Sequence, residues 1–423
     1  MNAMRGAGSA IPRDHSLDAT LALLSEGYAF IPNRCRHYGS DVFAARLMLS
    51  RVVCMSGREA AEQFYDRHRF TRRHALPRTS FALIQDHGSV MVMDGEAHRH
   101  RKAMFLSLVG PDALRRLADL FTRHWQEAVT RWAGQESSVL LDEAHRVITA
   151  AVCEWVGLPL DGREVDARAA EFAAMIAGTG AIGPRNWGGH LLRARTERWA
   201  RRVIEETRAG RRAVPEGAAR TIATYRDGQG QLLDVRTAGV ELINILRPTV
   251  ANARYIVFAA MALHDHPQWA EALRRGDDST LDRFAWEVRR VFPFIPFIGG
   301  RVREPFAWRG HDFKAGDWVL MDLYGTNHDP RLWHAPERFD PDRYRLRGEA
   351  IEAFNLISHG GGSAPDGHRC PGEGITQTLL VTAARLLTAS MRYDVPQQDL
   401  TIDLSNIPAR PRSGFVVSNV RPT

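Results

Sequence analysis

The segment HGGGSAPDGHRCPGEG, residues 359–374, decides the fold through the chemistry that it places around Cys370. Glycines and a proline before the cysteine favour an extended loop, and the apolar run over residues 375–387 is typical of a helix. A cysteine at the start of a helix lies near free peptide N–H groups, which stabilise a negative charge. His368 and Arg369 are potential cations beside it, and we expect them to lower the pKa of the Cys370 thiol.

This loop has more than one interpretation. A lone cysteine is most often a small buried hydrophobic residue. The frame of glycines and cations instead favours a thiolate, which acts as a nucleophile or as an axial metal ligand. Residues 359–362 also imitate the oxyanion-hole motif of serine esterases, but the sequence contains no Gly-x-Ser-x-Gly motif to supply the nucleophile. Other motifs therefore have to decide.

Two further motifs carry charge at regular spacing. Glu287 and Arg290 lie three residues apart in a segment with helical periodicity, where such a pair alone is usually an exposed ion pair of small worth. The segment PERFDP supplies Arg338, which would turn the pair into a triad that tolerates burial. His98 and Lys102, four residues apart, would share one helix face. Taken alone, that second pattern also fits a solvated basic surface or a chance His-x-His metal site.

In this order, the motifs resemble those of the cytochrome P-450 family. The resemblance implies a mainly α fold with small β-sheets, the cytochrome P-450 fold, and a haem b cofactor (iron protoporphyrin IX). It implies that Cys370 is the thiolate ligand of the haem iron and that Gly372 gives room beside the porphyrin. The chain departs from the usual pattern where Ser363 replaces a phenylalanine and Lys102 replaces an arginine. The same resemblance assigns the cofactor-binding residues as His98, Lys102, His368 and Cys370, and the structural triad as Glu287, Arg290 and Arg338.

The composition agrees with a globular enzyme. The chain has 423 residues, 44% of them hydrophobic, and no repeat or Pro/Ser-rich linker, so we expect a single domain over residues 1–423. Four scattered cysteines suggest neither a disulfide framework nor a zinc finger. No apolar run is long enough to span a bilayer and the first twenty residues lack a signal-peptide core, so we expect a cytoplasmic protein without a membrane anchor.

The net charge of +7 raises the question of a nucleic-acid partner. Basic residues gather in residues 193–212, but apolar residues alternate with them at helical spacing. That pattern is typical of an amphipathic helix with a solvated cationic face, so we expect no nucleic-acid partner.

A long helix expected over residues 235–263 contains the sequence Leu246-Arg247-Pro248-Thr249. Most P-450 proteins carry an acid–alcohol pair here, which delivers protons to iron-bound dioxygen. Proline opens the helix locally, and an arginine among apolar neighbours is costly to bury without a partner. Glu241 is an alternative internal partner for Arg247, but at six residues away it would face about the opposite side of the helix. A ligand carboxylate fits better, because it matches a guanidinium as a two-pronged fork.

An Arg-Pro pair at this position resembles the fatty-acid peroxygenase branch of the family, and the likeness spans almost the whole chain. The resemblance implies a fatty acid and hydrogen peroxide as substrates, with no redox partner required. Arg247 and Pro248 are the implied catalytic residues, where Arg247 anchors the substrate carboxylate and that carboxylate acts as the general acid–base. The implied products are hydroxy fatty acids and, by decarboxylation, terminal alkenes. We expect hydroxylation to predominate.

Several residues are expected to surround the substrate. Met91 stands just before an expected strand, where this branch often has Gln or His, and it offers neither a proton nor a strong hydrogen bond. For Ile176, packing in the hydrophobic core and lining of the substrate pocket are equally compatible with the sequence. The residues expected to line the substrate pocket with Arg247 are Met91, Gln85, Ile176 and Phe294.

Two other functions remain open from the sequence. The first is a redox-partner-dependent P-450 fatty acid monooxygenase, against which the missing acid–alcohol pair argues. The second is a non-catalytic haem-binding fatty-acid sensor, which would bind the acid without forming any product.

Overall fold

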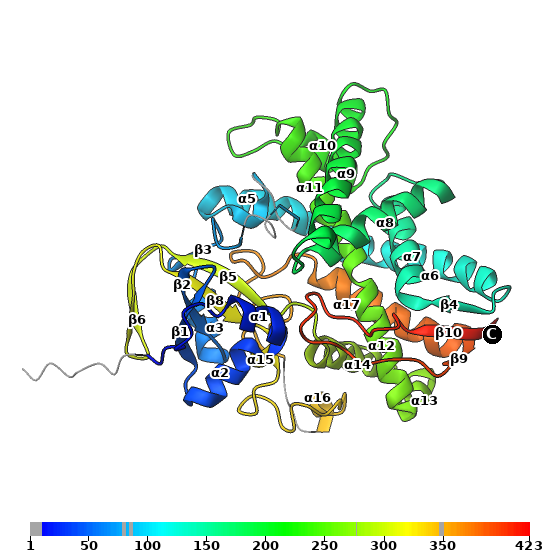
Figure 1. The fold of residues 1–423 in the computed structure, drawn as a ribbon. Helices are drawn as coiled ribbons and strands as arrows, with labels where there is room; N and C mark the ends of the chain where they lie inside the picture. Colours follow the sequence, from blue (N-terminus) through cyan, green and yellow to red (C-terminus); the bar gives the residue numbers. More distant parts are fainter. Residues whose placement is uncertain (1–10, 78–81, 84–87, 276, 347–350) are drawn as a thin grey trace, which may run out of the picture.

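The computed structural model describes residues 11–77, 82–83, 88–275, 277–346 and 351–423. Helices form most of it, and strands form three small sheets, as expected for a mainly α protein (Figure 1). The α-helices are α1 (Thr20–Glu26), α2 (Phe30–Tyr38), α3 (Arg58–Phe64), α5 (Gly95–Ser107), α6 (Pro111–Trp132), α7 (Leu140–Trp155), α8 (Gly162–Gly178), α9 (Pro184–Arg208), α10 (Ala218–Thr224), α11 (Val235–Ala251), α12 (Ala253–Asp265), α13 (Pro267–Arg275), α14 (Asp278–Val291), α15 (Tyr324–Asn327), α16 (Arg343–Leu346) and α17 (Glu373–Arg385). Short 3₁₀ turns are η1 (Gly27–Ala29) and η2 (Val90–Val92), and η3 (Leu386–Ser390) is a π-helix.

The strands group into sheets of five, three and two. Their orders are β1-β2-β8-β5-β3, β4-β10-β9 and β6-β7. Small sheets were expected, but the sequence analysis located neither the β1–β2 hairpin nor β5. The strands are β1 (Val42–Leu47), β2 (Ser50–Met55), β3 (Phe70–Thr71), β4 (Ser137–Val139), β5 (Phe297–Val302), β6 (Phe306–Trp308), β7 (His311–Phe313), β8 (Trp318–Asp322), β9 (Met391–Asp394) and β10 (Val416–Pro422).

Helix periodicity explains the main core. In α6, the buried residues Leu117, Phe121, Trp125 and Trp132 follow one another at steps of four, four and seven residues. They therefore lie on one face of the helix, which packs against the helices that follow. Helices α7, α8, α9, α11, α12, α14 and α17 contribute to the same apolar cluster. The two faces of the five-stranded sheet build two separate clusters at the other end of the molecule (Figure 1). The expectation of a single domain over residues 1–423 stays a prediction. Over the part of the chain that is described, no helix is both long and apolar enough to cross a bilayer.

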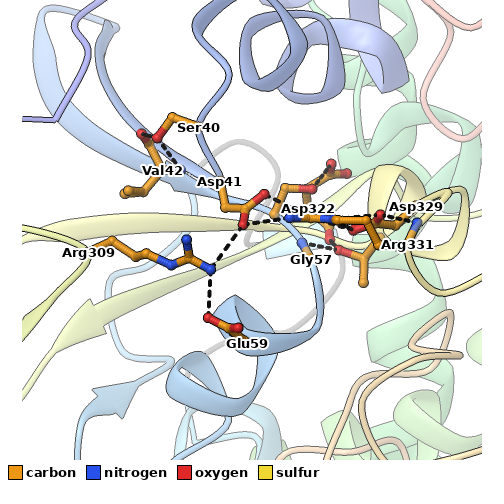
Figure 2. Close-up of polar contacts among 11 residues, drawn as sticks. Ser40, Asp41, Val42, Gly57, Glu59, Arg309, Asp322, Asp329 and Arg331 are labelled. Atoms are coloured by element: carbon orange, nitrogen blue, oxygen red, sulfur yellow. Dashed lines mark hydrogen bonds and ion pairs between the residues drawn. The ribbon is translucent and has the colours of Figure 1, made fainter.

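A polar cluster fastens the five-stranded sheet to the segment after β8 (Figure 2). Arg331 bridges Asp329, at 2.6 Å, and Asp41, at 2.8 Å, just before β1. The Asp322 carboxylate at the end of β8 is buried and accepts hydrogen bonds from the Ser56 hydroxyl and the Gly325 N–H, each at 2.8 Å. Burial raises the pKa of Asp322 to about 7.

The expected charge triad forms, with one member corrected. The Glu287 carboxylate accepts hydrogen bonds from Arg290, at 2.8 Å, and from Arg343 Nε, at 3.0 Å, and all three side chains are fully buried. The assignment of Arg338 to the triad was wrong. Its side chain is exposed, and it contributes only its backbone carbonyl, which accepts from Arg290 and from Arg343. The triad is therefore Glu287, Arg290 and Arg343.

Replacing Arg343 with alanine should destabilise the protein strongly, because Glu287 would lose a buried cationic partner. We expect the free energy of unfolding to fall by about 3–5 kcal/mol, measured by urea denaturation. The matched control is Arg338→Ala, which keeps the backbone carbonyl and should change stability by less than about 0.5 kcal/mol. Equal losses from the two variants would contradict the corrected triad.

Asp322 should make stability depend on pH. Its pKa is raised in the folded protein, so between about pH 4 and 7 the unfolded chain releases a proton that the folded chain keeps, and stability falls as pH rises. Asp322→Asn has no titrating group at this position. The stability of Asp322→Asn minus that of wild type should therefore rise with pH, by at most about 1.4 kcal/mol per pH unit up to about pH 7, and then level off. Urea denaturation from pH 5 to 8 measures this difference. The exposed Asp399→Asn should show no such rise, and a flat profile for Asp322→Asn would count against the raised pKa.

Candidate active site

The Cys370 loop leads directly into α17. The Cys370 N–H donates to the His359 carbonyl at 2.9 Å, which closes the loop, and α17 begins at Glu373. Gly372 lies beside the sulfur, because a Cβ atom on it would make an ordinary van der Waals contact with Cys370 Sγ at 3.7 Å. Arg369 pairs with Glu373 at 2.7 Å and holds the loop against the helix. The cysteine therefore lies at a helix start, as the sequence predicted.

The expected electrostatics of Cys370 were wrong in sign. Burial raises the pKa of the Cys370 thiol, and this effect exceeds the lowering by the Gly372 N–H and by Lys102. His368 supplies no charge at neutral pH, because burial lowers the pKa of its ring to about 4. The surrounding residues therefore leave a thiol, and a bound metal ion is what deprotonates such a group.

His98, Lys102, His368 and Cys370 come together as predicted. The rings of His98 and His368 lie 4.4 Å apart between centroids, and His368 Nε2 lies 3.9 Å from the Asp94 carboxylate. The buried Lys102 ammonium donates to the carbonyls of Gly367 and Arg369, the latter at 2.6 Å, and so links α5 to the Cys370 loop.

Arg72 joins this cluster, and the sequence analysis missed it. Its side chain is buried after β3, and among the described residues its Nε has no hydrogen-bond partner. Burial lowers the pKa of Arg72 to about 10, and its charge in turn lowers the pKa values of His368 and Lys102. A buried donor without a partner beside another cation fits a ligand that brings carboxylates, as haem propionates do. Arg72 belongs to no motif, so only its basic surroundings in residues 67–73 hinted at it.

Together these residues fit a haem. Cys370 Sγ would bind the iron, and Lys102, His98, His368 and Arg72 would face the propionates. Haem needs a sulfur ligand for its iron and donors for two propionate carboxylates, which Cys370 and the neighbouring cations would supply.

Arg247 is a buried cation for which the described residues supply no counter-ion. Only 4% of it is exposed, and its Nη1 donates to the Leu83 carbonyl at 2.7 Å. Across the described ranges, no carboxylate forms an ion pair with it. Burial and, to a smaller extent, the charge of Arg193 together lower the pKa of Arg247 to about 9. Glu241 is not the partner of Arg247, because the Glu241 carboxylate pairs with Arg101 at 2.8 Å. This agrees with the expectation that Glu241 and Arg247 face different sides of the helix.

The long helix that the sequence predicted is divided, but not at Pro248. Pro248 lies inside α11, and the division falls at Asn252, whose N–H bonds to the Thr249 carbonyl at 3.1 Å. Pro248 itself is exposed, although Arg247 and Thr249 on either side of it are buried. The Thr249 hydroxyl donates to the Ile245 carbonyl at 2.7 Å, so its proton is already committed.

The expected pocket residues lie in three different elements. Met91 lies in the 3₁₀ turn η2, so the expectation of a strand there was wrong, and it is partly buried. Ile176 is buried in α8, and Phe294 follows α14, where its ring stacks on Tyr255 at 4.3 Å. All three pack against the main core cluster. That they contact a substrate stays a prediction, and Gln85 lies outside the described residues.

Comparisons with known proteins agree with this site. A sequence model of the family described as Cytochrome P450 matches residues 279–396, which include the triad glutamate and Cys370. Cytochrome P450SP alpha (CYP152B1) in complex with (R)-ibuprophen is 43% identical, with a TM-score of 0.93, over 96% of this chain and 99% of that one. Cytochrome P450EX alpha (CYP152N1), wild-type with myristic acid, is 38% identical, with a TM-score of 0.94, over 98% and 100%.

A third solved structure extends the likeness. A Phe→Ala variant of cytochrome P450 OleT in complex with arachidonic acid is 31% identical, with a TM-score of 0.94, over 98% of this chain and 99% of that one. Identity at this level over nearly the whole chain confirms the expected fold and the expected resemblance. The chain belongs to the cytochrome P450 family, whose members bind haem through a cysteine thiolate.

Proposed function

We propose that this P450 is a fatty-acid peroxygenase, which uses hydrogen peroxide to oxidise a fatty acid at the carbons next to its carboxylate. The observation that carries the proposal is Arg247, a buried guanidinium that no carboxylate of the described chain neutralises. Solved relatives that hold myristic acid and arachidonic acid support the choice of substrate class. The residues of the haem site are Cys370 for the iron and His98, Lys102 and His368 for the propionates, and the cofactor is haem b. A cytoplasmic location stays a prediction.

Arg247 has two tasks in this mechanism. Its guanidinium binds the substrate carboxylate as a two-pronged fork, which turns an uncompensated charge into a buried ion pair. By fixing the head group, it also leaves only the first few carbons within reach of the oxidising centre. Pro248 keeps the neighbouring stretch of α11 open, so that the head group can approach.

The substrate carboxylate then serves as the proton-transfer group. The Thr249 hydroxyl is bonded to a helix carbonyl, and the Glu241 carboxylate is held by Arg101, so neither is free to move a proton. A carboxylate oxygen of the bound acid takes the proton from peroxide and returns it as water leaves. When bound, the haem supplies the two-electron oxidation. In hydroxylation one peroxide oxygen enters the substrate and the other leaves as water. In decarboxylation the products are the alkene, carbon dioxide and two waters.

Arg247→Leu should keep the haem but lose turnover of fatty acids. Without the anchor both positioning and proton transfer fail, so kcat/KM for myristic acid with peroxide should fall by about 100-fold or more. The matched control is Arg254→Leu, which also removes a buried arginine, one turn beyond the helix break, and should retain turnover. Retained activity in Arg247→Leu would contradict the anchoring role.

Wild-type enzyme given peroxide and myristic acid should form hydroxy acids, with a smaller amount of the terminal alkene. Met91 offers no proton and no strong hydrogen bond beside the substrate, and we expect hydroxylation to predominate. Mass spectrometry of the extracted products measures the ratio. Product that appears only with NAD(P)H and a reductase would instead identify a monooxygenase. A fatty-acid shift of the haem spectrum without product under either oxidant would identify a sensor.

A further inference from the structure

One face of α11 contacts the turn over residues 88–90, which precedes α5. Thr237, Glu241, Asn244 and Pro248 follow one another at steps of four, three and four residues, so they form a single stripe along the helix. The first three contact the turn over residues 88–90, and the fourth lies beside the anchor residue proposed above. The same stripe therefore joins a structural clamp to the proposed substrate site.

The turn is held by hydrogen bonds from successive residues. The Val90 N–H donates to Glu241 Oε1 at 2.8 Å. Asn244 Nδ2 donates to the Ser89 hydroxyl at 3.0 Å and to Glu241 Oε2 at 2.9 Å. Both Ser89 and Glu241 are completely buried. Met91 is the next residue of the turn, so its position follows from these bonds.

Close packing tightens the clamp at Gly88. This glycine has a φ of +78°, and a Cβ atom on it would come within 3.0 Å of Thr237 Oγ1. A side chain here would be strained and would push the turn away from α11. The turn can therefore lie this close to the helix only because residue 88 is glycine.

Helix α5 is tied to the same carboxylate. Arg101 Nη1 donates to Glu241 Oε1 at 2.8 Å and to the Gly88 carbonyl at 3.3 Å. Arg101 lies between His98 and Lys102, which the site analysis assigned to the haem propionates. Glu241 thus connects the helix of the anchor Arg247, the turn that carries Met91 and the helix that faces the cofactor.

The clamp is rigid because its charges are buried and paired. Burial raises the pKa of Glu241, while hydrogen bonds from Asn244, Arg101 and the Val90 N–H offset that effect. Breaking the bond between Glu241 and Arg101, Asn244 or the Val90 N–H would leave a further buried group unsatisfied, besides Arg101 Nε and Asn244 Oδ1, which have no partner among the described residues.

We infer that Glu241 is a positioning residue that sets which carbon of the bound fatty acid is oxidised. It fixes the distance between the carboxylate anchor on α11 and the Met91 turn, and so fixes how the first carbons of the acid are presented. This inference rests on the proposed fatty-acid peroxygenase function. A displacement of about 1 Å in such a site changes rates by about 100-fold, so a looser clamp should redistribute the products.

The test compares product ratios in Glu241→Gln and Asn244→Ala with wild type. Each variant is given myristic acid and hydrogen peroxide, and α-hydroxy acid, β-hydroxy acid and alkene are quantified by mass spectrometry. We expect the ratio of these products to change by about tenfold in Glu241→Gln and in the same direction, but less, in Asn244→Ala. The dissociation constant for myristic acid, from the haem spectral shift, should stay within about twofold in Asn244→Ala, because Arg247 is intact.

The control is Glu171→Gln in α8. Glu171 is also a buried glutamate, which pairs with Arg168 and accepts from the Thr196 hydroxyl at 2.7 Å, but it belongs to no clamp. A purely structural role of Glu241 would lower yield and stability and leave the product ratio unchanged, as we expect for Glu171→Gln. An unchanged ratio in Glu241→Gln and Asn244→Ala would overturn the inference.

Failure of a variant to fold and failure of the proposed function can each be distinguished from failure of the inference. If Glu241→Gln does not fold, Asn244→Ala and Ser89→Ala carry the test, since neither removes a charged side chain, and an unchanged ratio in both would again overturn the inference. If wild-type enzyme forms no oxidised acid with peroxide, the proposed function fails and this inference fails with it. Normal wild-type products with unchanged ratios in the variants would reject the positioning role alone.

Discussion

The charge of Arg247, which no carboxylate in the described ranges compensates, is the constraint on which the proposed chemistry depends. Taking a guanidinium out of water costs several kcal/mol, and a single backbone carbonyl at 2.7 Å returns only a part of this. The cost appears as a pKa lowered to about 9, which still leaves the group protonated at neutral pH. A ligand carboxylate removes this cost when it binds. In the proposed function, this electrostatic cost is what gives the site its affinity for carboxylic acids.

The other proton-carrying groups of this helix are already committed. Thr249 donates its hydroxyl proton to the preceding turn, and the Glu241 carboxylate accepts from Arg101, Asn244 and the Val90 amide. A group that transfers protons needs a free lone pair near the reacting atoms and room to change its charge. Among the described side chains of α11, none is free to transfer protons, so the proposed mechanism assigns proton transfer to the carboxylate of the bound substrate. Binding and proton transfer then depend on the same head group, so an otherwise similar molecule without a carboxylate would lack both.

Local motifs predicted the parts of the site in which neighbouring residues carry the chemistry. The positions of Cys370 near a helix start and of His98 and Lys102 on one helix face follow from spacing, whereas the resemblance to the P-450 family assigned the roles of these residues and of Arg247. The third triad member did not follow from spacing, because Arg338 and Arg343 lie five residues apart in an irregular segment. Only the turn into α16 decides which of the two guanidinium groups points inward.

Quantities that sum over distant residues were also beyond the sequence. The sign of the Cys370 pKa shift depends on burial by the whole fold, which outweighs the adjacent charges. Arg72 joins the propionate cluster through strand pairing between β3 and β5, and no spacing rule connects it to Cys370. The β1–β2 hairpin was missed because both of its strands are largely buried and lack the alternation that marks a half-exposed strand.

Helix α11 shows how pairing decides what a buried charge can do. Glu241 and Arg247 lie six residues apart and face different sides, so they cannot neutralise each other. Glu241 is balanced by Arg101, and the balance makes its surroundings rigid, because moving any partner exposes an unsatisfied group. Arg247 is balanced by no carboxylate among the described residues, and the proposed function assigns that role to the substrate. In that proposal, the separation of the two charges along α11 lets one helix both hold the turn over residues 88–90 and bind the acid.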